Sequence, residues 1–108
     1  MRRSPERRID LELVHVARDP RARQQLGAFV YYCVARIERD LGPVAHWSVK
    51  VAPTHSGFAT SIHVDDRGAV LDVQADAFDG PLAVWDAMCR IEQRLREERA
   101  LPHSAHAK

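Results

Sequence analysis

The residues best suited to chemistry are the arginines of segment 79–99, DGPLAVWDAMCRIEQRLREER. A guanidinium group matches phosphate geometry closely, so arginines off the apolar side of a helix can bind a polyanion. Spacings of four, three and four residues define that apolar side: Val84, Met88, Ile91 and Leu95. Four arginines lie largely off it: Arg90, Arg94, Arg96 and Arg99. We expect three of them to contact phosphate groups: Arg90, Arg94 and Arg96.

A second cationic strip lies on the expected helix over residues 20–41. Arg36 and Arg39 fall on the polar side of this helix, and Tyr32 lies one turn before Arg36. Arginines in such a strip hold RNA phosphates, while a tyrosine ring stacks on a base or ribose. These three residues complete the set of candidate RNA-binding residues.

Both strips also permit a purely structural interpretation, in which the arginines form a solvated face. Opposite charges on neighbouring turns of a helix pair with one another. The sequence offers several such pairs, with Glu38 as a further acid near Arg36: Arg36–Asp40, Asp86–Arg90, Glu92–Arg96 and Arg90–Glu97. Periodicity alone leaves both interpretations open.

Catalytic and metal-binding chemistry has little support in the sequence. No Ser–His–Asp grouping, phosphate-binding glycine loop or pair of acids appears at a recognisable spacing. His46, His63 and Asp72 are expected on one face of a sheet, but no zinc-ligand motif connects them. We therefore predict that the protein is not an enzyme and has no metal site, cofactor or small-molecule substrate.

The two tryptophans and two cysteines are expected to serve packing. Trp47 alternates with Val49 and belongs to the core, whereas Trp85 lies at the core edge, over the boundary between the helices. Exposure of Trp85 would instead make it a stacking or protein-contact residue. Cys33 and Cys89 lie on the two helices without a Cys-rich pattern, which is typical of reduced, buried thiols.

The elements that must position these side chains follow the order β-α-β-β-β-α. Alternation predicts strands over 9–16, 44–51, 58–65 and 69–76, with a turn at residues 65–68 between the last two. Asp19-Pro20 begins the first helix and Gly42-Pro43 ends it. We expect an α+β fold in which two helices cover one face of a four-stranded sheet. The other face would be polar: His46, Ser48, Lys50, Ala59, Ser61, His63, Asp72, Gln74 and Asp76.

Length and composition limit the functional classes. A chain of 108 residues with 45% hydrophobic and 29% charged residues is one globular domain, expected over residues 9–99. Residues 1–8 are expected to form a flexible basic arm, and 100–108 a flexible tail. The net charge is only +1, so binding to a polyanion requires a local patch. No apolar run suits a membrane span or a signal peptide, and a cytoplasmic location is expected.

The order and spacing of these elements resemble the ribosome hibernation promoting factor family, which includes the ribosome-associated inhibitor proteins. Arg36-Ile37-Glu38 stands where the family's first helix typically ends in Lys-Leu-Glu. The strand 59–64, ATSIHV, resembles the family's A-x-L-x-V strand. Segment 79–84, DGPLAV, resembles the family's D-M-Y-A-A-I, and residues 90–96 resemble its K-L-E-R-Q-L-R run.

The resemblance implies a fold like a double-stranded RNA-binding domain and binding to rRNA of the small ribosomal subunit. It implies a translation inhibitor of the short form, which occupies the mRNA–tRNA path through basic helical residues. Carried over by position, those residues are Arg36, Arg39, Arg90 and Arg96. Gln93 and Glu97 replace basic residues of the family pattern, which favours the alternative of a protein–protein interaction module without ribosome binding. A free-standing RNA-binding regulator is the third hypothesis.

Overall fold

The structure is a computed structural model that describes residues 8–15 and 17–101. It contains β1 (Arg8–Leu13), α1 (Pro20–Leu41), β2 (His46–Pro53), β3 (Phe58–Asp66), β4 (Ala69–Ala77) and α2 (Gly80–Ala100). The predicted order and the α+β class are therefore confirmed. The arm and tail expected over 1–8 and 100–108 lie outside the described residues, except that Arg8 begins β1, Ala100 ends α2, and Leu101 follows it.

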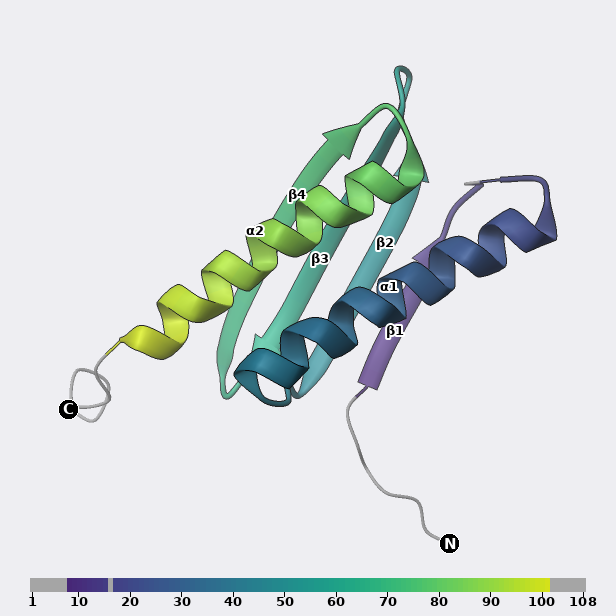
Figure 1. Ribbon diagram of the computed structural model, residues 1–108. Coiled ribbons are helices and arrows are strands. Elements are labelled where there is room, and N and C mark those ends of the chain that lie inside the picture. Colours follow the sequence, from purple (N-terminus) through teal and green to yellow (C-terminus); the bar gives the residue numbers. More distant parts are fainter. Residues whose placement is uncertain (1–7, 16, 102–108) are drawn as a thin grey trace, which may run out of the picture.

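The four strands form one mixed sheet in the order β1-β2-β3-β4. β1 pairs parallel with β2, and the other neighbours pair antiparallel. Figure 1 shows α1 lying over β1 and β2, and α2 over β3 and β4, on the same face of the sheet. One face is thus covered by both helices, and the opposite face is left to the polar residues.

Local sequence signals account for the helix starts. The carboxylate of Asp19 accepts a hydrogen bond from the backbone N–H of Arg21, and that of Asp79 accepts one from Leu82, at 3.0 and 2.8 Å. Each helix also carries a proline at its first or second position, where the missing N–H has no intrahelical partner to lose. The predicted start of the first helix is confirmed, and the second helix begins at Gly80, within the segment 79–99 whose apolar spacing indicated it.

The hairpin between β3 and β4 has a two-residue turn, Arg67-Gly68. Both residues have positive φ, 59° and 88°, as a type I′ turn requires. Strand pairing reaches Asp66 and Ala69, one residue further on β3 than alternation predicted. At the other end of the sheet, a Cβ atom on Gly57 would collide with the carbonyl oxygen of Ala77, so only glycine fits there.

The observed strand boundaries differ from the predicted ones on all four strands. The largest differences are on the first two, where β1 covers Arg8–Leu13 instead of 9–16 and β2 covers His46–Pro53 instead of 44–51, while β3 and β4 each end one residue later than predicted. The first strand ends at Leu13, because the backbone leaves the sheet at His15, whose φ is 47°; the predicted last residue, Val16, lies outside the described residues. The second strand begins at His46 rather than at Val44. The N–H of Val44 donates instead to the Glu38 carboxylate at 3.0 Å, so this residue belongs to the connection from α1.

The core fills the space between the sheet and the helices. The expected stripe of α2 is fully buried, and so is Trp47 near the start of β2. The indole N–H of Trp47 donates to Glu38 at 3.0 Å, which satisfies the one polar atom of this buried ring. Glu38, considered from the sequence as a further acid near Arg36, thus holds Trp47. No helix within the described residues is long and apolar enough to cross a membrane.

Candidate nucleic-acid interface

Three charged side chains join α1 to α2 across the boundary between the two helices. Glu92 of α2 accepts a hydrogen bond from Nη2 of Arg36 at 3.1 Å and one from Nη2 of Arg96 at 2.8 Å. Two candidate RNA-binding arginines from different helices are therefore held beside one carboxylate. We call Arg36, Glu92 and Arg96 the interhelical cluster.

The electrostatics of the cluster favour the charged forms of Arg36 and Glu92. The hydrogen bond from Arg96 lowers the pKa of Glu92, and partial burial opposes this shift only in part. Burial would lower the pKa of Arg36, but its hydrogen bond to Glu92 and the nearby negative charge raise it overall. The cluster as a whole thus carries one net positive charge.

The expected local pair Arg36–Asp40 is not formed within the described residues. Arg36 reaches across to Glu92, while Asp40 faces Nη2 of Arg96 at 3.9 Å. The Glu92 side chain is only 16% exposed, whereas that of Asp40 is 45% exposed. The charge of Glu92 is therefore less screened by solvent. The expected pair Glu92–Arg96 is confirmed.

An aromatic strip runs beside the cluster, formed by Tyr32, Phe29 and Trp85. The ring centroids of Tyr32 and Phe29 are 6.4 Å apart with an angle of 15° between planes, and those of Phe29 and Trp85 are 6.3 Å apart at 24°. The Arg36 guanidinium lies 5.3 Å from the Trp85 ring centroid. Trp85 covers the helix boundary as expected, yet it remains 39% exposed.

Arg39 lies on the last turn of α1 and is exposed. Within residues 8–15 and 17–101 it forms no hydrogen bond or ion pair. Its guanidinium charge is therefore the least compensated of the candidate set on α1, and an incoming phosphate would displace no partner that belongs to the described part of the chain.

Arg90 and Arg94 lie on the opposite flank of α2, facing β4. With Cys89, Gln93 and residues of β4 they line a shallow hollow of about 460 Å³. Arg90 donates to the backbone carbonyl of Gln74 at 2.8 Å, which satisfies an acceptor on the edge strand. The six candidate residues thus divide between two flanks of α2 rather than forming one strip.

Two other expected pairs, Asp86–Arg90 and Arg90–Glu97, are absent from the described part of the chain. Arg90 turns toward the sheet instead, where an unpaired strand carbonyl is available. Glu97 accepts a hydrogen bond from Nε2 of Gln93 at 3.1 Å. The intrahelical interpretation therefore holds for Arg96 and fails for Arg90.

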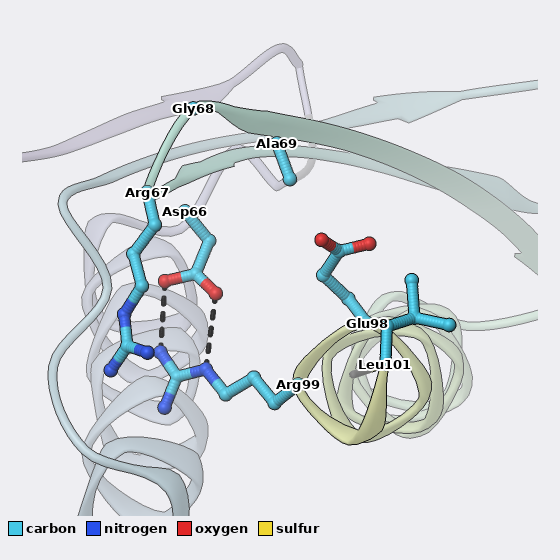
Figure 2. Close-up of a pocket in the computed structure, with 7 residues that line it drawn as sticks. All are labelled: Asp66, Arg67, Gly68, Ala69, Glu98, Arg99 and Leu101. Atoms are coloured by element: carbon cyan, nitrogen blue, oxygen red, sulfur yellow. Dashed lines mark hydrogen bonds and ion pairs between the residues drawn. The ribbon is translucent and has the colours of Figure 1, made fainter. Parts of the chain in front are cut away.

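Arg99 is a structural residue rather than an exposed cation. Its guanidinium forms a two-point ion pair with Asp66, as Figure 2 shows, and donates to the carbonyl oxygens of Leu41 and Pro43. These contacts join the end of β3, the end of α1 and the last turn of α2. The hollow beside them, about 410 Å³, is lined by two arginines and two carboxylates, so its lining has no net positive charge to attract an anion: Arg67 and Arg99, with Asp66 and Glu98. Sequence periodicity gave no signal for this pairing.

The uncovered sheet face carries two histidine–carboxylate pairs. His63 Nδ1 lies 2.6 Å from Asp72, and His46 Nε2 lies 2.9 Å from Asp10. The grouping of His46 with His63 and Asp72 considered from the sequence is not assembled, because His46 turns toward β1. Among the described residues, no three His, Cys, Asp or Glu side chains gather closely enough to hold a metal ion.

The two cysteines differ in environment. Cys33 is fully buried, and burial raises the pKa of its thiol to about 11. Cys89 is exposed, contrary to the expectation of a buried thiol, because it lies on the side of α2 that faces away from the core. Both are free thiols.

Comparison with known proteins identifies a shared fold. No protein-family model and no curated protein sequence matches this chain. A ribosomal subunit interface protein from Coxiella burnetii has a similar structure, with a TM-score of 0.72 and 17% identity over 87% of this chain and 99% of that one. The N-terminal domain of Protein Y from Thermus thermophilus gives a TM-score of 0.66 at 20% identity, over 83% of this chain and 97% of that domain. The fold implied by the sequence resemblance is confirmed.

Proposed function

We propose that this chain is a ribosome-binding factor that inhibits translation by occupying the mRNA–tRNA path of the small ribosomal subunit. The observation that carries the proposal is the fold, which this chain shares over 87% of its length with a protein named for the ribosomal subunit interface. The sequence resemblance to hibernation factors, drawn from strand and helix motifs, independently supports the same class.

The proposed action is steric and electrostatic. The body of the domain fills a cleft in the subunit, and arginine side chains neutralise rRNA phosphates, so that no bond is made or broken. Such a role requires neither a cofactor nor a small-molecule substrate, and it places the protein in the cytoplasm with the ribosomes.

We assign one group of phosphate contacts to α1 and to the side of α2 that faces α1. Arg39 is exposed without a partner among the described residues, and Arg36 and Arg96 share one carboxylate between two guanidinium groups. Arg90 and Arg94 form a second group on the β4 flank. With Tyr32, these are the residues that we propose for RNA binding.

A protein–protein interaction module is the second candidate. The observation that favours it is the exposure of large apolar side chains on the helical face, where Trp85 is 39% and Leu82 39% exposed. Glu92 and Asp40 also reduce the positive charge there. An apolar interface responds weakly to salt, whereas phosphate binding weakens steeply, so salt dependence separates the two functions.

The test is co-sedimentation with purified small subunits and whole ribosomes at about 50 and 500 mM salt. We expect stoichiometric binding to the small subunit that is lost at the higher salt. Arg39→Glu should weaken it, whereas Arg21→Glu, an equal charge change on the exposed first turn of α1, should not. No binding at low salt, or binding that salt does not weaken, would contradict the proposal and favour a protein partner.

A further inference from the structure

The aromatic strip is more exposed than core packing requires. Tyr32 is 58% and Trp85 39% exposed, and neither belongs to the buried core; Phe29 lies between them and packs partly against it. Burying such rings is strongly favourable, so rings left in water on a rigid surface are available to a ligand. The rings are stacked with near-parallel planes, so they form one row that runs from α1 to α2 and has Tyr32, its most exposed ring, at one end.

The charges beside the strip favour a nucleic acid over an apolar peptide. The guanidinium of Arg36 adjoins Trp85, and Tyr32, Arg36 and Arg39 follow at spacings of four and three along one side of α1. At 1.5 Å of rise per residue, Tyr32 and Arg39 are about 10 Å apart along the helix axis, a distance that one or two nucleotides bridge. A base on Tyr32 would therefore leave its neighbouring phosphates within reach of both arginines.

We infer that Tyr32, Phe29 and Trp85 form a binding site for unpaired nucleobases of single-stranded RNA, which stack on the exposed rings while Arg36 and Arg39 bind the adjacent phosphates. This deepens the proposed function, in which Tyr32 already contacts RNA, since it assigns a base-stacking site built from three rings on two helices. It rests on that function only for the source of the RNA, and the site can be tested without ribosomes.

Intrinsic fluorescence provides a direct readout. The chain has two tryptophans, and Trp47 is fully buried, so quenching by a stacked base reports on Trp85. The probe is an adenosine hexaribonucleotide, titrated at low salt, with an abasic ribose–phosphate hexamer of equal charge as the comparison. We expect saturable quenching by the hexanucleotide, weaker binding of the abasic chain, and loss of most of the signal in Trp85→Phe.

A matched pair of tyrosine variants tests whether the aromatic strip contributes to the affinity for RNA. Tyr32→Leu should raise the Kd for the hexanucleotide at least about fivefold, which corresponds to the lower end of base–aromatic stacking, ~1 kcal/mol. Tyr31→Leu is the control, because Tyr31 is 47% exposed at the adjacent position and has no ring contact within the described residues. The Kd of Tyr31→Leu for the hexanucleotide should equal that of the wild type, and circular dichroism should show that both variants are folded.

Two results would overturn the inference: equal affinity for the abasic and the normal hexamer, or equal weakening by the two tyrosine variants. Stacking without ribosome co-sedimentation would leave this site in place and remove the proposed function. Co-sedimentation with ribosomes in the absence of base stacking would overturn this inference and leave the proposed function in place.

Discussion

Arg99 and Asp66 form a two-point ion pair across 33 positions of the chain, with Nε–Oδ2 and Nη2–Oδ1 distances of 3.0 and 2.8 Å. The Asp66 side chain is 2% exposed and that of Arg99 15%. The same guanidinium donates to the carbonyls of Leu41 and Pro43, so one side chain joins the ends of α1, β3 and α2.

Asp66→Asn should therefore destabilise the fold strongly. The amide cannot balance the Arg99 charge, and breaking a buried ion pair by removing one partner costs about 3 kcal/mol or more. Urea denaturation measures this as a fall in the free energy of unfolding. Asp65→Asn is the matched control, since Asp65 is half-buried on the same strand and forms no ion pair within the described residues; an equal loss in both variants would contradict the role of the pair.

Glu92→Gln should lower stability in a pH-dependent way. The pKa of Glu92 is lowered in the folded state from its ordinary value of 4.5, so its stabilisation is fully present above about pH 4.5 and is lost as pH falls through the folded pKa. Near neutral pH we expect a loss of about 1–2 kcal/mol, because two charge-assisted hydrogen bonds are weakened.

The difference between wild type and Glu92→Gln should therefore shrink toward zero in acid. Urea denaturation over a series of pH values measures this difference. Glu97→Gln, on the other flank of α2, should show little difference at any pH. A gap between wild type and Glu92→Gln that is independent of pH would show that the effect is not electrostatic.

Salt titration of ribosome binding can distinguish the contribution of the arginines on the α1 side from that of the arginines on the β4 side of α2. Arg39→Ala and Arg94→Ala should each reduce the slope of log K against log salt by about 0.7–0.9, the amount expected for one phosphate contact. Arg21→Ala should leave the slope unchanged. If only one of the two flank variants changes the slope, the candidate set contracts to that flank.

The cysteines should react at different rates with iodoacetamide near pH 8. Cys89 is exposed and should be alkylated, whereas Cys33 is buried and its thiol pKa of about 11 leaves little thiolate. Mass spectrometry should find one modified thiol in the native protein and two after unfolding in denaturant. Fast modification of both native thiols would contradict the packing of Cys33.

Thr60→Val should stabilise the protein by about 1 kcal/mol. Thr60 is fully buried on β3, and its hydroxyl has no hydrogen-bond partner within the described residues, so removing it relieves a desolvation cost. Thermal denaturation should show a higher Tm. Thr54→Val provides the contrast: its hydroxyl accepts from the N–H of Ser56 at 3.3 Å, and its loss should not raise the Tm.

The sequence by itself determined the elements and the composition of the core. Caps such as Asp19 and Asp79, and apolar repeats such as that of α2, depend on residues within about one turn, so they can be read along the chain. The alternation that placed Trp47 in the core is local for the same reason. Strand ends were less accurate, because the limits of pairing are set by the neighbouring strand and by contacts such as Glu38 with Val44.

Only the tertiary structure decided which arginines are held by other groups of the protein and which are available to bind phosphate. Arg36 and Glu92 are 56 positions apart, and whether they meet depends on how α1 and α2 are rotated and aligned on the sheet. The same holds for Arg90 with the Gln74 carbonyl, for Arg99 with Asp66, and for the aromatic strip, which needs Trp85 beside Phe29. Helical periodicity places a side chain on a face of its own helix, but the partner on that face comes from packing between elements distant in the chain.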